Sequence, residues 1–159
     1  MNEIPLKERM KIARHAMPAQ KPQDRIGNFN EVNQGFTPRM ALEEAQRCLQ
    51  CKAAPCTDGC PVHVKIPQFI LKIVEGEPLA AADTILEDNF LPAICGRVCP
   101  QENLCEAKCV LAKKGKPVAI GNLERFTADS TTALRSAREE KVEAQPTGKK
   151  VALVGSGPA

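Results

Sequence analysis

The chain has 159 residues, of which five are phenylalanine and none is tryptophan or tyrosine, so aromatic side chains contribute little to its core. The formal charge of +3 is spread along the chain, which disfavours a nucleic-acid or anionic-membrane surface. The N-terminal residues lack the apolar run of a signal peptide, and no stretch is apolar enough to span a bilayer. We therefore expect a cytoplasmic protein that binds neither nucleic acid nor a membrane.

Residues 1–36 predict an N-terminal helix followed by an extended arm. The segment from Ile4 to Met17 is amphipathic, whereas residues 21–36 carry the proline, glycine and asparagine residues typical of irregular chain. Neither piece has enough apolar residues to form a core alone. His15 lies in this region, and we expect it to be solvated.

Residues 37–100 carry the start and stop signals of several helices. The predicted helices are one capped by Thr37 that ends near Cys48, one that begins at Pro67 and is stopped by Gly76, one from Pro78 to Asn89, and one that begins near Pro92. The second has the clearest apolar stripe, formed by Ile66, Phe69, Ile70, Ile73 and Val74. We expect it to be the main core helix.

The next segments predict two further helices. QENLCEAKCVLAKK, residues 101–114, has acidic residues early and lysines late, and Gly115 follows, which suits the helix dipole and the usual terminal glycine. A last helix from Ile120 fades into residues 131–148, whose composition is that of an exposed linker. The expected helical domain is thus 37–130.

The final residues, KKVALVGSGPA, change character. A short β-branched run over 149–154 precedes Gly155 and Gly157, which is the pattern of the first strand and glycine turn of a dinucleotide-binding unit. Such a βαβ unit needs about thirty residues, so the predicted site is truncated. The expected fold class is mainly α, with one C-terminal strand.

Eight cysteines fall into two sets. They are Cys48, Cys51, Cys56 and Cys60, then Cys95, Cys99, Cys105 and Cys109. In a reducing compartment this number indicates metal or redox chemistry rather than disulfides. Zinc sites usually pair two C-x-x-C knuckles, and the chain has one such pair, so zinc fits poorly. Eight small buried residues without a ligand role would not explain the clustering beside proline and glycine.

The spacing favours two iron–sulfur clusters that exchange one ligand each. Iron–sulfur sites commonly take three cysteines from a local run and a fourth from elsewhere, often a cysteine before proline. Cluster A would then be held by Cys48, Cys51, Cys56 and Cys109, and cluster B by Cys60, Cys95, Cys99 and Cys105. Two purely local sets of four remain the alternative. Exchange would tie both cysteine runs together and replace the missing aromatic core.

The motifs RCLQC, APC, GCPVH, ICGRVCPQENLCEAKC, AIGNLERF and KKVALVGSGPA, in this order and spacing, resemble the N-terminal region of the small (β) subunit of NADPH-dependent glutamate synthase. The same domain occurs in related NAD(P)H flavin oxidoreductases and in dihydropyrimidine dehydrogenase. The resemblance covers residues 24–159 and implies an α-helical ferredoxin-like domain with two 4Fe-4S clusters in the exchanged pairing.

The resemblance also implies a function. The domain would relay electrons between a flavin, reduced by NADPH in the full-length enzyme, and a partner redox centre. FAD and NADPH would bind domains absent from this chain, so the chain alone would not be a competent enzyme. The expected partners are those missing domains and a large glutamate synthase-type subunit or another redox protein. A structural zinc or non-redox iron–sulfur module for subunit docking is the alternative, and the final substrate is not determined.

Several other residues lie beside the cysteines. Some relatives replace one cysteine by Gln or Glu, which draws attention to Glu102 and Glu106. We expect His63 to lie at the surface or near a cluster without binding it. Lys65, Arg97 and Lys108 could add positive charge near the clusters. Gly59 and Gly96 would let backbone N–H groups approach the sulfurs.

Overall fold

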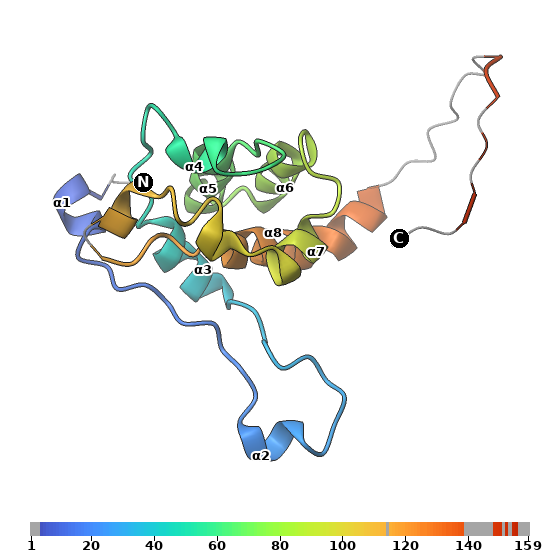
Figure 1. The fold of residues 1–159 in the computed structure, drawn as a ribbon, viewed down its shortest axis with the longest axis horizontal. Helices are drawn as coiled ribbons and strands as arrows, with labels where there is room; N and C mark the ends of the chain where they lie inside the picture. The colour runs from blue at the N-terminus through green and yellow to red at the C-terminus, as the bar shows by residue number, and fades with distance from the viewer. Residues whose placement is uncertain (1–3, 114, 139–147, 151, 153, 156–159) are drawn as a thin grey trace.

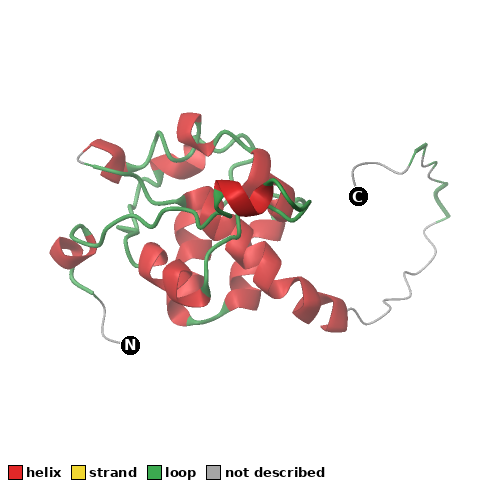
Figure 2. Ribbon diagram, turned by 90° about the horizontal axis from the view of Figure 1, so that it is seen from below, coloured by secondary structure: helices red, strands yellow, loops and turns green. Residues whose placement is uncertain are grey.

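The computed structural model describes residues 4–113, 115–138, 148–150, 152 and 154–155, and within them the chain folds into helices joined by long loops (Figure 1). The α-helices are α1 (Leu6–Arg9), α2 (Pro22–Arg25), α3 (Pro38–Ala45), α4 (Pro55–Asp58), α5 (Ile66–Glu75), α6 (Pro78–Leu86), α7 (Pro92–Val98) and α8 (Ile120–Arg138). Two short 3-10 helices are η1 (Gln101–Asn103) and η2 (Val110–Lys113). None of the described residues forms a strand (Figure 2), so the mainly helical class is confirmed.

Helices α5 and α8 form the centre of the body. Four of the five residues in the predicted stripe of α5 are buried, namely Ile66, Phe69, Ile70 and Ile73, while Val74 is half-buried against the core. Gly76 ends the helix with a φ of 78°. Helix α6 packs against both α5 and α8, and α7 packs along α8. The predicted cap of α3 is also present, since Thr37 Oγ1 accepts a hydrogen bond from the Met40 amide at 3.3 Å.

Helix α8 is longer than its sequence suggests. It continues to Arg138, past residue 130, where the composition predicts a linker. Its buried positions include Ile120, Leu123, Thr127 and Thr131, which recur three or four residues apart. Packing of this face against α6 and α7 extends the helix beyond what composition alone indicates.

The N-terminal region is less helical than predicted. Helix α1 spans four residues, and the predicted extended arm contains the single-turn helix α2. The arm projects from the helical body and returns to it (Figure 1). An isolated bridge between Ala19 and Asn33 closes its base. The arm is thus a closed loop rather than an open extended segment.

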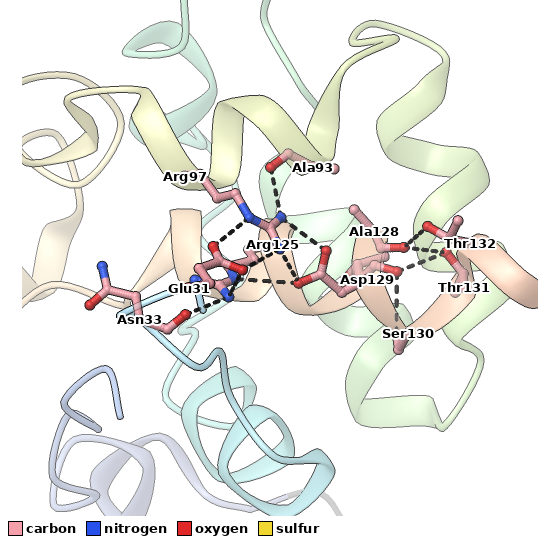
Figure 3. Close-up of polar contacts among 11 residues, drawn as sticks. Glu31, Asn33, Ala93, Arg97, Arg125, Ala128, Asp129, Ser130, Thr131 and Thr132 are labelled. Carbon is pink, nitrogen blue, oxygen red and sulfur yellow. Dashed lines mark hydrogen bonds and ion pairs between the residues drawn. The ribbon is translucent and has the colours of Figure 1, made fainter. Parts of the chain in front are cut away.

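Arginine side chains fasten the returning arm to α7 and α8. Arg125 is buried and donates a hydrogen bond through Nη2 to the Asn33 carbonyl at 2.7 Å (Figure 3). Arg97 donates to the carboxylates of Glu31 and Asp129, with atom separations of 2.8 to 3.3 Å. The Arg97 charge is therefore engaged by two carboxylates, and Lys65 is paired with Glu87.

A buried ion pair joins three distant segments. Glu44 is fully buried and accepts hydrogen bonds from Arg47 Nη1 at 2.5 Å, the Ala119 amide at 2.9 Å and the His15 amide at 2.8 Å. Arg47 in turn donates to the carbonyls of Ile12, Lys116 and Pro117. The prediction of a solvated His15 is wrong, because its ring packs edge-on against Phe36 and binds Glu43.

We expect Glu44→Gln to destabilise the chain by about 3–5 kcal/mol, the usual cost of breaking a buried ion pair. The side-chain amide of glutamine would also place an N–H group opposite one of the N–H donors whose hydrogen bonds the carboxylate now accepts. The measurement is the urea midpoint followed by circular dichroism under anaerobic conditions. Glu43→Gln is the matched control, since that neighbouring carboxylate is half-exposed and its loss should cost about 1 kcal/mol or less. Equal midpoints for the two variants would contradict the prediction.

The C-terminal strand stays a prediction. The described residues of this segment, Lys149, Lys150, Ala152 and Val154, have no strand assignment. Gly155 has a left-handed φ of 87°, as a glycine turn requires, while Gly157 lies outside the described residues. None of the helices in the described residues has the length and apolar character needed to cross a membrane.

Candidate metal centre

The structure brings the first cysteine triple together with the last cysteine. One cavity, here called cavity A, is lined by Cys48, Cys51, Cys56 and Cys109. Apolar side chains from the start of α5, from the 110–118 segment and from the start of α8 complete its wall. Cys48 and Cys56 are buried, and Cys51 and Cys109 are half-buried.

A second cavity, cavity B, is lined by the other four cysteines, Cys60, Cys95, Cys99 and Cys105. Cys105 is buried and the other three are half-buried. Each cavity therefore draws sulfurs from both cysteine runs, and each contains the members of one predicted exchanged set. The alternative with two local sets would place Cys60 with the first triple, which is not the grouping found around the two cavities.

All eight cysteines are free thiols. The pKa of Cys48 is raised to about 11, mainly by burial and in part by the neighbouring sulfurs of Cys109 and Cys51. Burial likewise raises the pKa of Cys56 and of Cys105 to about 12. These thiols are protonated at neutral pH in the metal-free chain, so a metal that binds them as thiolates must displace protons.

The segment after Cys99 is not the helix predicted for residues 101–114. It forms η1, a series of turns and η2, with Leu104 at φ −117° and ψ −108° between them. In an α-helix, Cys105 and Cys109 would lie four positions apart on one face. The broken path instead directs Cys105 to cavity B and Cys109 to cavity A. Local helix signals are thus overridden by the placement of the two sulfurs.

Two glycines allow distant segments to approach closely. A Cβ atom on Gly59 would lie 2.8 Å from the Leu104 carbonyl oxygen and 3.2 Å from the Cys105 Cα. A Cβ on Gly96 would lie 2.7 Å from the Arg125 backbone nitrogen. These contacts are with backbone and side chains of other segments. The observed role of both glycines is therefore close packing of α4 and α7 against other segments, and the approach of N–H groups to sulfur stays a prediction.

Polar side chains that the sequence analysis did not select also line cavity B. They are Asn89, Gln101 and Glu124. Asn89 does not end α6 as predicted, because the helix stops at Leu86. The side-chain Nδ2 of Asn89 instead donates a hydrogen bond to Glu124 Oε1 at 2.7 Å. The Asn89 oxygen accepts from the Leu91 amide at 3.0 Å and from the Cys95 thiol at 3.7 Å. Gln101 donates to the Cys95 carbonyl at 2.8 Å.

Glu124 adds a carboxylate to the four sulfurs of cavity B. It is 9% exposed, and burial raises the pKa of this carboxyl to about 7, although the Asn89 hydrogen bond opposes the shift. Cavity B thus offers five potential ligands where a 4Fe-4S cluster uses four. The only sequence signal for Glu124 was its place in the AIGNLERF motif.

The other flagged residues lie outside both cavities. Glu106 is buried but forms an ion pair with Arg14 at 2.8 Å, while Glu102, His63 and Lys108 are exposed. The surface position expected for His63 is confirmed. Among the described residues, no three His, Cys, Asp or Glu side chains are placed to hold one metal ion. A 4Fe-4S cluster binds each thiolate at a different iron atom, so four sulfurs spread around a cavity fit a cluster as a donor set.

Comparison with known proteins gives consistent matches. Residues 25–136 match the family described as dihydropyrimidine dehydrogenase domain II, 4Fe-4S cluster. The glutamate synthase [NADPH] small chain of Halomonas elongata is 39% identical over 143 residues, which cover 89% of this chain and 30% of that protein. The corresponding Escherichia coli K12 protein is 40% identical over 131 residues, or 82% and 28% of the two chains.

A relative with a different named activity is equally similar. The NAD-dependent dihydropyrimidine dehydrogenase subunit PreT of Salmonella typhimurium is 41% identical over 131 residues, covering 82% of this chain and 31% of that protein. The chain therefore spans less than a third of the length of these curated relatives.

Proposed function

Because the chain belongs to the 4Fe-4S family of dihydropyrimidine dehydrogenase domain II, we propose that it is an electron-transfer domain with two 4Fe-4S clusters. The observation that carries the proposal is the pair of cavities, each lined by four free cysteines. Cys48, Cys51, Cys56 and Cys109 would hold one cluster, and Cys60, Cys95, Cys99 and Cys105 the other. A bound 4Fe-4S cluster supplies one-electron redox chemistry.

The chain's own residues support this role by excluding water and fixing the sulfurs. Cavity A has a wall of buried apolar side chains, including Ile70, Leu111 and Val118. Arg9 donates to the Cys48 carbonyl at 2.9 Å, and Gln101 donates to the Cys95 carbonyl. Hydrogen bonds and limited solvent access around thiolate ligands are the means by which a protein sets the potential of a cluster.

The relay itself is proposed from the relatives. We propose that the clusters pass electrons between a flavin, reduced by NADPH in a longer protein, and a partner redox centre. FAD and NADPH would bind domains beyond the helical one, with Gly155 and Gly157 beginning the FAD site. The partners would be those domains and a large glutamate synthase-type subunit or another redox protein. The glutamate synthase small chains among the relatives favour a large glutamate synthase-type subunit as the partner. The dihydropyrimidine dehydrogenase subunit favours another redox protein.

Iron and sulfide analysis with electron paramagnetic resonance tests the proposal. After anaerobic reconstitution, we expect about eight iron and eight sulfide per chain and a broad absorption shoulder near 400 nm. Reduction should give a paramagnetic signal. A colourless protein that binds zinc would favour the structural docking module, and clusters that resist titanium(III) citrate would contradict the relay.

The fourth ligand of cavity B can be tested by a matched pair of variants. With four cysteines as ligands, Cys95→Ala should lose about half of the iron, whereas Glu124→Ala should keep it. Iron per chain and the resonance Raman Fe–S bands are the measurements. The reverse result would assign the fourth position to Glu124, a buried carboxylate that accepts a hydrogen bond from Asn89. Cys95 would then remain a thiol bound to Asn89.

A further inference from the structure

Two isoleucines, Ile66 and Ile120, lie between the two cysteine cavities. Each lines both cavity A and cavity B, which no other described residue does. Their exposed fractions are 2% and 3%, so both are fully enclosed by protein. These two side chains therefore form the wall that the cavities share, here called the isoleucine wall.

The isoleucine wall is also where two central helices begin. Ile66 is the first residue of α5 and Ile120 the first residue of α8. The Ile66 amide donates to the Val64 carbonyl at 2.7 Å, and the Ile120 amide donates to the Val118 carbonyl at 2.9 Å. A helix N-terminus carries partial positive charge, and neither helix has an acidic residue in its first turn. At the start of α8 this charge faces the buried Glu44 carboxylate, which accepts a hydrogen bond from the Ala119 amide at 2.9 Å.

We infer that Ile66 and Ile120 are positioning residues that set the reduction potentials of both cysteine sites together. The inference rests on the proposed binding of 4Fe-4S clusters. Four thiolates around such a cluster leave a net charge of roughly −2, and reduction adds one more negative charge. An apolar wall without hydrogen-bond donors disfavours that added charge in both cavities at once. A polar group placed in the wall should therefore raise both potentials.

Threonine and valine substitutions isolate the polar effect, because the two side chains have nearly the same shape. We expect Ile66→Thr and Ile120→Thr each to raise both midpoint potentials relative to the corresponding valine variants, with unchanged iron and sulfide content. The potentials are measured by redox titration of the reconstituted chain, followed by electron paramagnetic resonance. A cluster that titanium(III) citrate does not reduce is followed by the frequencies of its resonance Raman Fe–S bands.

Two controls lie on the same helix as Ile66. Ile70 lines cavity A and not cavity B, so Ile70→Thr should shift one potential relative to Ile70→Val. Ile73 is buried but lines neither cavity, so its variants should shift none. If a threonine variant loses iron, the valine variants at positions 66, 120, 70 and 73 are compared with the unaltered chain instead. The same pattern is expected: both potentials change for the first two positions, one for position 70 and none for position 73.

The outcomes separate this inference from the proposed function. An unaltered chain that binds no iron refutes the proposed function itself. An unaltered chain with both clusters, in which Ile66 and Ile120 variants change one potential or none, overturns the isoleucine wall while leaving the function intact. A shift of equal size in the Ile73 variants would show that the effect comes from general loss of packing.

Discussion

Removing Cys56 and Cys109 together is expected to cost no more iron than removing either one alone. Both sulfurs line cavity A, so each single alanine variant should already lose that cluster and keep about four iron atoms. The double variant should keep the same four. In contrast, Cys56→Ala combined with Cys60→Ala should lose both clusters, because Cys60 lines cavity B. The measurement is iron and sulfide per chain after anaerobic reconstitution.

The two pairings are distinguished by whether the iron losses of two single cysteine variants add up in the double variant. With two local sets, Cys56 and Cys60 would serve one cluster, so their double variant would keep half of the iron, and the Cys56 and Cys109 double variant would lose all of it. That pattern would refute the exchanged ligands. Serine is avoided as a replacement because its oxygen can still bind iron. Circular dichroism of each variant is the check that its helices remain.

The second large effect is expected from Gly59→Ala, which should lose most of the iron of cavity B. The added Cβ would sit 2.8 Å from the Leu104 carbonyl oxygen and 2.8 Å from the Lys108 Cγ. The lysine side chain can move, but the carbonyl is backbone next to Cys105. Relief of the clash separates Cys60 from Cys105, which both line cavity B. Overpacking of this kind typically costs about 1–3 kcal/mol, and the loss of cluster binding adds to it.

Gly115→Ala is the matched control for the glycine variant. Nothing lies within 4 Å of the Cβ position at Gly115, and its φ is not in the left-handed region. Its iron content and melting temperature should therefore equal those of the unaltered chain. Full iron binding by Gly59→Ala, with an unchanged melting temperature, would show that the two cysteine runs do not need this close approach.

Local signals predicted much of the helical scaffold. The Thr37 cap, the stripe of α5 and the left-handed Gly76 depend on residues close together in the chain, and all three are confirmed. The resemblance to the glutamate synthase small subunit family is likewise confirmed by the relatives. The division into domains and the assignment of the eight ligands stay predictions.

The errors have a common physical cause. Residues 101–114 have good helix signals, but a continuous helix would place Cys105 and Cys109 on one face, and the chain sends them to different cavities. Asparagine is a residue type that often ends helices, yet the side-chain amide of Asn89 is buried against Glu124. In both cases contacts with distant segments outweigh a local preference that is worth less than about 1 kcal/mol per residue.

Eight thiols beside proline and glycine, like the starts of most helices, are local features, so the amino-acid sequence was enough to predict an iron–sulfur site on a helical scaffold. The spacing favoured the exchanged sets but left two local sets open, and the tertiary structure groups the sulfurs around two cavities as exchange predicts. The tertiary structure also showed that Gly59 is a packing contact and that Glu124 faces the second site. It also decided that Ile66 and Ile120 separate the two cavities. The contacts of Gly59, Glu124 and the two isoleucines join residues tens of positions apart. They depend on how α5 and α8 pack, and no local signal in the sequence reports that packing.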